Sequence, residues 1–168
     1  MLIWYKNLPH TNLVESESLS STPDYFITQV VALRYDAQGN LIERINAEQT
    51  LHYIQTSRTL LENPNIDRYS ISGSWHAHAS QGTIEDGSND ILLSRNAEAV
   101  KKYKQSEDVI LHADTIHYLD QDKSLTSQGD AILISSQGKT SAGKIITYIN
   151  SEEVVMTGSV RGNYETTH

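Results

Sequence analysis

The sequence predicts an all-β fold of stacked antiparallel hairpins, and three observations support this prediction. From Tyr25 onward, short runs rich in Val, Ile, Thr, Tyr and Phe recur along the chain, and these residue types favour strands. Clusters of Gly, Asn, Asp and Ser separate the runs, as tight turns require. The third observation is an internal repeat in which each unit reads strand, polar turn, strand.

The individual strands follow from this alternation of runs and turns. The first hairpin pairs residues 25–35 with residues 41–47 through a turn that contains Gly39 and Asn40, because Gly and Asn readily adopt the backbone angles of such turns. Residues 96–105 have a helical-looking composition, but we assign them to strand and loop because their flanks repeat the strand pattern. The later strands are predicted at residues 60–61, 72–78, 82–85, 91–94, 109–111, 116–118, 131–135, 144–149, 154–157 and 160–164.

The internal repeat is anchored on four alanines. Ala47, Ala79, Ala113 and Ala142 each lie near the start of a predicted strand, 32, 34 and 29 residues apart. A hairpin that cannot close a core alone stacks on its neighbours. Such a stack either closes into a barrel or forms a two-sheet jelly roll. Each unit ends in Asn or Gly shortly before a small residue or Pro, at residues 63–64, 96–97, 129–131 and 158–160.

The composition limits how full the interior of this stack can be. Hydrophobic residues make up 38% of the 168 residues, below the roughly 45–50% of typical domains. We therefore expect one domain whose interior is only partly filled and forms an elongated apolar groove, which would suit an acyl chain. The strands at both ends of an open stack keep unpaired N–H and C=O groups, which invite another chain to add a strand.

Charge and cysteine content exclude several classes of function. The 13 basic and 21 acidic residues give a net charge of −8. The one small basic cluster, Lys101, Lys102 and Lys104, is too small for the basic face of a nucleic-acid-binding protein. An anionic lipid would have to be held mainly by its apolar tails. The chain contains no cysteine, which excludes disulfides and thiolate zinc sites.

The N-terminal residues indicate a membrane anchor upstream of Met1. The apolar start ends in Trp4-Tyr5-Lys6, as transmembrane helices often do where they leave the bilayer. The alternative is an ordinary flexible N-terminus. Because the residues that follow are rich in Ser and Glu, we assign residues 1–23 to a juxtamembrane segment and flexible linker, and residues 24–168 to the β domain.

Candidate metal and catalytic sites are weak in this sequence. On a strand, His112 and Asp114 point to one face and His117 to the other, so these side chains do not converge on a metal ion. His76 and His78 share a face but lack a third ligand. The sequence has neither a G-x-S-x-G motif nor a Gly-rich phosphate loop. We therefore predict no metal, no cofactor and no enzymatic activity.

Four segments carry a resemblance to a known family, and together they span roughly residues 25–165. These segments and their order resemble the LptC family of lipopolysaccharide-export proteins. They also resemble the wider group of β-jelly-roll domains that this family shares with LptA. The resemblance implies an open twisted β-jelly roll at the periplasmic face of the inner membrane, with a single N-terminal transmembrane anchor. The segments are YFITQVVALRYDAQGNLIERINAEQTLHY, LLENPNI, LHADTIHYLDQDKSLTSQGDAILISSQGKTSAG and VVMTGSVRGNYE.

The resemblance also implies a non-catalytic role in lipopolysaccharide transport. Such a protein accepts lipopolysaccharide from the inner-membrane ABC transporter at its N-terminal edge. It then passes the lipid to the periplasmic bridge protein LptA, which adds a strand at the C-terminal edge. We expect apolar strand residues to line a lipid groove, with Val30 and Leu61 first because each lies in a segment that matches the family well. The other groove candidates are Phe26, Ile45, Ile91, Leu93, Ile132, Ile134 and Met156.

The predicted docking edge for LptA lies in the last two strands, where few charges defend an exposed edge. Two other functions stay open. A soluble periplasmic bridge like LptA would carry a cleavable signal peptide instead of an uncleaved helix, and a purely structural β-repeat module would join proteins without lipid. A sugar-active enzyme would need a carboxylate pair that the sequence does not single out. The predicted docking residues are Val154, Met156, Val160 and Tyr164.

Overall fold

The computed structural model describes residues 22–164. These residues form an antiparallel sheet of twelve strands, which confirms the all-β prediction. No helix in this range is long and apolar enough to cross a membrane. The Trp4-Tyr5-Lys6 segment and nearly all of the predicted linker lie outside the described residues. The strands are β1 (Tyr25–Tyr35), β2 (Leu41–Tyr53), β3 (Arg58–Glu62), β4 (Asn65–Tyr69), β5 (Gly73–His78), β6 (Gln81–Glu85), β7 (Ile91–Tyr103), β8 (Val109–Leu119), β9 (Ser124–Ser135), β10 (Gly138–Tyr148), β11 (Val154–Thr157) and β12 (Arg161–Tyr164).

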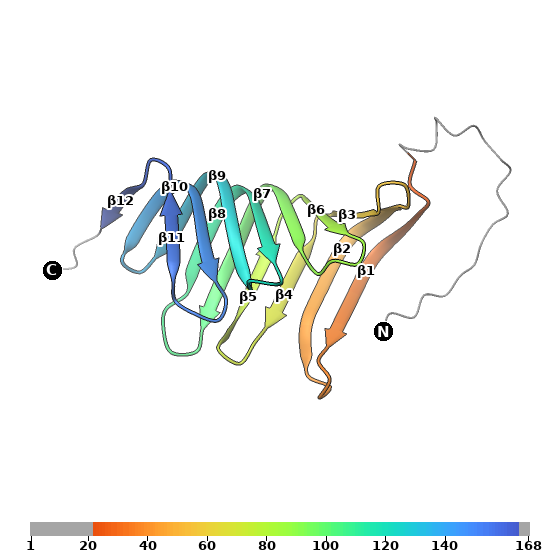
Figure 1. Ribbon diagram of the computed structural model, residues 1–168, viewed down its shortest axis with the longest axis horizontal. Coiled ribbons are helices and arrows are strands. Elements are labelled where there is room, and N and C mark those ends of the chain that lie inside the picture. The colour runs from red at the N-terminus through yellow and green to blue at the C-terminus, as the bar shows by residue number, and fades with distance from the viewer. Residues whose placement is uncertain (1–21, 165–168) are drawn as a thin grey trace, which may run out of the picture.

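The sheet folds into two layers that face each other (Figure 1). β2 pairs through residues 43–46 with β4 and through residues 49–53 with β3. In the same way, β7 pairs through residues 98–103 with β5 and through residues 91–94 with β6. Layer A therefore contains β4, β5 and β12, and layer B contains β3, β6 and β11. The long strands β1, β2, β7, β8, β9 and β10 contribute to both layers, which is the predicted jelly roll.

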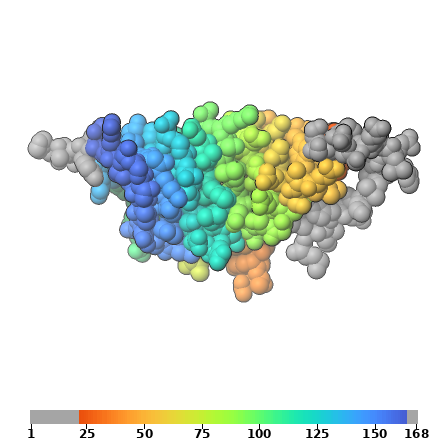
Figure 2. Space-filling model, turned by 45° about the horizontal axis from the view of Figure 1, so that its top comes forward, coloured from red at the N-terminus to blue at the C-terminus, as the bar shows by residue number. Residues whose placement is uncertain are grey.

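The strands follow one another along the long axis of the molecule. β1 and β2 lie at one end, and β10, β11 and β12 lie at the other (Figure 1). The space-filling view shows the same order as bands of colour that succeed one another along this axis (Figure 2). The two ends of the jelly roll are therefore formed by the two ends of the chain.

The long strands bend at one corner of the molecule. Each unit of the sequence repeat places one of its ends at this corner. The residues that end the repeats have left-handed backbone angles, namely Asn63 (φ 47°), Asn96 (φ 55°), Gly129 (φ 77°) and Gly158 (φ 77°). Inside the corner lies a row of alanines, each at most 8% exposed. Because alanine is small, the two layers can meet closely there. The row contains Ala47, Ala79, Ala97, Ala113, Ala131 and Ala142.

Beyond the corner, inward-facing side chains form continuous rows across the strands. The residues of a row are register partners on successive strands. The middle row of layer A runs through Ala32, Ile45, Ile66, Ala77, Ala99, Leu111 and Leu133. The middle row of layer B runs through Ile27, Thr50, Leu61, Gly82, Leu93, Ile116, Ser127, Ile145 and Met156.

The side opposite the corner, where turns of layer A meet turns of layer B, is here named the mouth. The row nearest the mouth in layer A is formed by buried polar and aromatic residues, Glu43, Arg68, Trp75 and Lys101. It faces Ile91, Tyr118, Leu125 and Thr147 in layer B.

The interior between β4 and β10 is filled by side chains, whereas the composition predicted a partly filled groove. Ile66, Leu111 and Ile145 are completely buried, and Trp75 is 1% exposed. The middle rows also contain small residues, including Gly82, where an added Cβ would lie 3.2 Å from the Pro64 side chain. Small residues on one layer thus compensate for the shortage of large apolar residues.

The observed strands differ from the predicted ones mainly at the corner. Several predicted short runs join into one long strand across a β-bulge, as in β8, where the register shifts between His112 and Thr115. The sequence did not predict β4, because Asp67 and Arg68 interrupt its apolar pattern. β7 extends to Tyr103, which confirms strand and loop in place of a helix for residues 96–105.

We predict that Gly129→Ala destabilises the fold more than Gly39→Ala, as measured by urea denaturation. Both glycines have positive φ, which costs a residue with a Cβ about 1–2 kcal/mol. At Gly129 the added Cβ would also lie 2.8 Å from Asp114 Cβ, whereas at Gly39 nothing lies within 4 Å. We expect a loss of about 3 kcal/mol for Gly129→Ala. Equal losses for the two variants would show that the corner is not tightly packed.

Candidate functional site

Apart from Met156, which lies on β11, the structure places five of the eight other groove candidates on the inner face of the jelly roll. Leu61, Leu93 and Ile45 belong to the middle rows, Ile91 lies near the mouth, and Val30 is the register partner of Ala47 at the corner. The first four are at most 8% exposed, and Val30 is half-buried. These residues come from β1, β2, β3 and β7, so they lie toward the N-terminal end of the stack.

The other three candidates lie on outer faces. Ile132 and Ile134 alternate along β9 with the buried Ala131 and Leu133, so they point away from the interior. Phe26 is 64% exposed. The sequence did not determine these directions because residues 25–33 and residues 131–134 are each apolar at both alternate positions.

A bend in β1 explains why inward-facing and outward-facing side chains do not alternate regularly along this strand. Gln29 has a left-handed backbone (φ 52°) and shifts the inward positions by one residue. Ile27 faces the interior before it, and Val30 and Ala32 face the interior after it. Beside this bend lies a hollow of about 340 Å³, lined by Gln29, Val30, Val31, Asn46, Ala47, Glu48, Asn63 and Asn65.

The N-terminal end of the jelly roll has an exposed, apolar edge strand. Among the described strands, β1 pairs with β2 alone. Its outer-face side chains are large and apolar, including Phe26, Val31 at 58% exposure and Tyr35 at 55% exposure. An exposed apolar edge of this kind is a surface that another strand or sheet can cover.

The C-terminal end is formed by two short strands that continue both layers. β11 pairs with the half of β10 in layer B, and β12 pairs with the half in layer A. Met156 ends the middle row of layer B and packs against the core, while Val154 is the partner of Thr147. Val160 is half exposed between the two strands, and Tyr164 is the backbone partner of Gly138. The predicted docking residues are thus brought together at one edge.

A buried ion cluster joins the two layers at the mouth. Arg68 of β4 forms an ion pair with Glu43 in layer A. Across the mouth, its Nη1 lies 2.9 Å from Asp120 Oδ1 and its Nη2 donates to the Asn89 carbonyl at 3.0 Å. The guanidinium also lies 3.7 Å above the Tyr118 ring. One buried arginine therefore binds three segments from both layers.

The cluster stabilises the charged form of its carboxylate. Burial alone would raise the pKa of Asp120, but hydrogen bonds from Lys123, Tyr118 and Arg68 outweigh it and hold this pKa well below its usual range. Burial raises the pKa of Tyr118, so its hydroxyl stays protonated and donates to Asp120 at 2.8 Å.

A second contact between the layers is made by Lys101. This side chain is 2% exposed, donates to the Tyr148 carbonyl and lies 4.6 Å from the centre of the Tyr103 ring. Burial lowers the pKa of Lys101 to about 8, and the Glu152 carboxylate partly opposes this shift. The sequence reasoning missed Arg68 and Lys101, although each occupies an inward position of its strand, two residues after a buried apolar residue.

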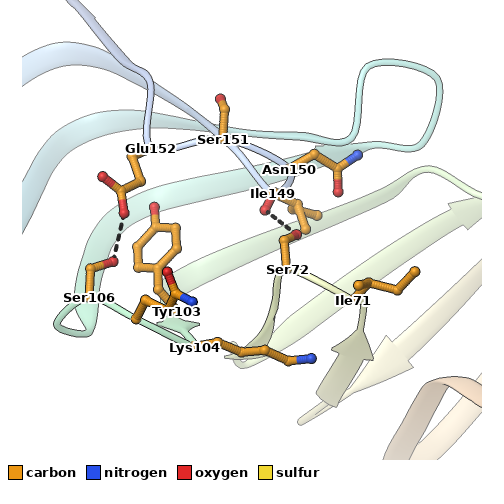
Figure 3. A pocket seen from close by; sticks show the side chains of 10 residues that line it. Ile71, Ser72, Tyr103, Lys104, Ser106, Ile149, Asn150, Ser151 and Glu152 are labelled. Carbon is orange, nitrogen blue, oxygen red and sulfur yellow. Dashed lines mark hydrogen bonds between the residues drawn. The ribbon is translucent and has the colours of Figure 1, made fainter.

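Turns of both layers at the mouth line a partly open pocket of about 300 Å³ (Figure 3). Ser72 Oγ donates to the Ile149 carbonyl at 3.5 Å, and Ser106 Oγ lies 2.8 Å from Glu152 Oε1. Both contacts cross from layer A to layer B, as the dashed lines in Figure 3 show. Together with Arg68 and Lys101, they hold the mouth closed along the C-terminal part of the stack.

Three of the described histidines, His52, His76 and His112, each pair with a single carboxylate. His76 Nδ1 lies 2.6 Å from Asp67 Oδ1, and His112 Nδ1 lies 3.1 Å from Glu98 Oε2. The rings of His76 and His78 are 6.3 Å apart. Within residues 22–164, no group of three His, Cys, Asp or Glu side chains is placed to hold a metal ion.

Comparisons with known proteins agree with this architecture. A family model described as "Lipopolysaccharide-assembly, LptC-related" matches residues 1–165. Among solved structures, a similar fold is that of LptH from Pseudomonas aeruginosa, described as the LptA homologous periplasmic component of the conserved lipopolysaccharide transport device. The TM-score is 0.62 at 11% identity, over 74% of this chain and 95% of that chain. At this identity the likeness concerns the fold alone. No curated protein matches the chain.

We predict that Arg68→Met costs about 3–5 kcal/mol of stability at pH 7, because it leaves Glu43 and Asp120 without their shared buried cation. Urea denaturation measures this loss. The matched control is Arg58→Met, because Arg58 and Glu85 form an exposed pair, with side chains 54% and 68% exposed, and such pairs contribute less than about 1 kcal/mol. A loss for Arg68→Met no larger than that of the control would contradict the importance of the cluster.

Proposed function

Because the chain belongs to the LptC-related family of lipopolysaccharide assembly, we propose that it is a transport component that accepts lipopolysaccharide at its β1 end and passes it on at its β11–β12 end. The donor is the inner-membrane ABC transporter, and the acceptor is the periplasmic bridge protein LptA. The protein lies at the periplasmic face of the inner membrane, held by a single N-terminal transmembrane anchor. Its role is non-catalytic and needs no cofactor.

One observation carries this proposal, namely that the inner rows run through the whole stack and reach both ends. The middle row of layer B begins with Ile27 on the edge strand β1 and ends with Met156 on the edge strand β11. A protein that adds its own strands at either end would extend these rows without interruption. The apolar interior would then continue from one partner to the next.

Acyl chains supply the attraction in this proposal. The net charge of −8 gives an anionic lipid no general electrostatic attraction. Transfer of each methylene out of water contributes about 0.8 kcal/mol, so several chains could hold a lipid. Because the interior between β4 and β10 is filled, chains would enter there only as the layers separate. The strands are continuous at the corner, so this separation would take place at the mouth.

The position of a lipid can be tested with two neighbouring leucines of β7. Leu93 faces the interior at 2% exposure, and Leu92 faces outward at 36% exposure. We expect an aliphatic diazirine residue at Leu93 to crosslink to lipopolysaccharide in cells, and the same residue at Leu92 to give little adduct. Leu61 and Val30 should behave as Leu93 does.

The outcome separates the candidate functions. Lipid adducts at Leu93 with an uncleaved N-terminus support the anchored carrier, and lipid adducts with a cleaved signal peptide support a soluble LptA-like bridge. Adducts with protein partners alone would support a structural module without lipid and would contradict the proposal.

The docking edge can be tested with two neighbouring residues of β11. Met156→Lys places an inward-pointing charge at the end of the middle row, a device that blocks strand addition in natural sheets. We expect it to weaken capture by LptA about tenfold or more, since burying an unpaired charge costs more than about 1.4 kcal/mol. Val155→Lys on the outer face of the same strand is the control and should have a small effect. Equal effects, with both variants folded by circular dichroism, would place the docking edge elsewhere.

A further inference from the structure

The interior of the jelly roll contains buried polar groups that have no hydrogen-bond partner. Within the described residues these include the hydroxyls of Thr50, Ser127 and Thr147 and the indole N–H of Trp75. Ser127 and Thr147 are completely buried, Trp75 is 1% exposed and Thr50 is 6% exposed. These groups are distinct from the ion cluster at the mouth, whose charged side chains pair with one another.

The three hydroxyls all belong to the inner face of layer B. Ser127 lies in the middle row between its register partners Ile116 and Ile145. Thr147 lies on the adjacent strand, one row nearer the mouth, beside Leu125. Because Ser127 and Thr147 are diagonal neighbours on β9 and β10, one bound chain could reach both. Thr50 lies at the N-terminal end of the same middle row, beside Leu61.

Trp75 faces these residues from layer A. Its ring centre lies 5.4 Å from that of Tyr118, and Tyr118 shares its row with Leu125 and Thr147. The indole N–H can only donate a hydrogen bond, whereas a hydroxyl can donate or accept. A ligand that satisfies this set must therefore bring at least one oxygen acceptor.

A core selected for stability alone would not keep these groups. An unpaired buried hydroxyl is unfavourable, and Ala or Val would fill similar space without a polar atom. A plain hydrocarbon chain would leave all of them unpaired. An acyl chain that carries a hydroxyl, or that reaches the site with its ester or amide oxygen, would pair with them inside the apolar rows.

We propose that the interior selects acyl chains that carry an oxygen substituent over plain hydrocarbon chains, with Ser127 and Thr147 as specificity-determining residues. This inference rests on the proposed lipid-carrying function. It identifies the chemistry of the chain within the groove and is independent of the headgroup. It also explains why polar side chains interrupt the middle row of layer B.

The test compares two acids that differ by a single hydroxyl, tetradecanoic acid and 3-hydroxytetradecanoic acid. The full chain carries Trp4→Phe, so that Trp75 is the sole tryptophan of the two in the sequence and its fluorescence reports binding. We expect the hydroxylated acid to bind about three- to tenfold more tightly, as one or two added hydrogen bonds would give. Ser127→Ala and Thr147→Val should each bring this ratio toward one without lowering the thermal unfolding midpoint of the lipid-free protein.

The matched control is Thr126→Val, which removes a hydroxyl from the outer face of the same strand and should leave the ratio unchanged. Equal binding of the two acids, binding of neither, or a ratio that survives both interior substitutions would overturn the inference. So would a fall in the unfolding midpoint with an unchanged ratio, because the hydroxyls would then have a structural role only. Lipopolysaccharide labelling at Leu93 separates the two failures: if it persists, the proposed function stands and this selectivity alone fails.

Discussion

The continuous hydrogen-bonded ladder from β1 to β11 and β12 is the constraint on which the rest of this structure depends. Each strand satisfies the backbone groups of its neighbours, and each long strand also joins the two layers at the corner. The corner contains alanines and residues with left-handed backbone angles. These residues let the long strands bend sharply, so that the two layers lie face to face. Among the strands of residues 22–164, β1 pairs only with β2, and β11 and β12 pair only with β10, so these three strands form the edges. The proposed partner sites lie at these edges for this reason.

The contrast between the corner and the mouth gives the molecule a hinge-like construction. At the corner the layers are joined by covalent chain, whereas at the mouth they are joined by side-chain contacts of Arg68, Lys101, Ser72 and Ser106. Buried ion pairs contribute little net stability because desolvation offsets their attraction. They nonetheless specify which segments meet. Separation at the mouth would leave the ladder intact, as the proposed carriage of acyl chains requires.

The interior is filled by side chains, yet the proposed function requires space for acyl chains. Separation of the layers at the mouth would provide this space. The middle rows combine small residues such as Ala77 and Ala99 with unpaired hydroxyls such as Ser127 and Thr147. Small side chains bring the layers together when no lipid is present, and the hydroxyls remain unsatisfied in that state. Packing and polarity in the same rows therefore agree with a core that exchanges its own contacts for those of a ligand.

The sequence by itself determined the all-β class, the turns and the spacing of the bends at the corner, because residue type and local spacing fix all three. Ala47, Ala79, Ala113 and Ala142 anchor both the repeat and the corner, and Asn63, Asn96, Gly129 and Gly158 mark the bends. Only the tertiary structure decided which side chains face the interior. The bend at Gln29 shifts the inward positions of β1, and Phe26 faces outward there. On β9, Ala131 and Leu133 are buried, so Ile132 and Ile134 face outward. The pairing of Arg68 with Asp120, 52 residues later, likewise depends on the two layers meeting at the mouth, which no local pattern encodes.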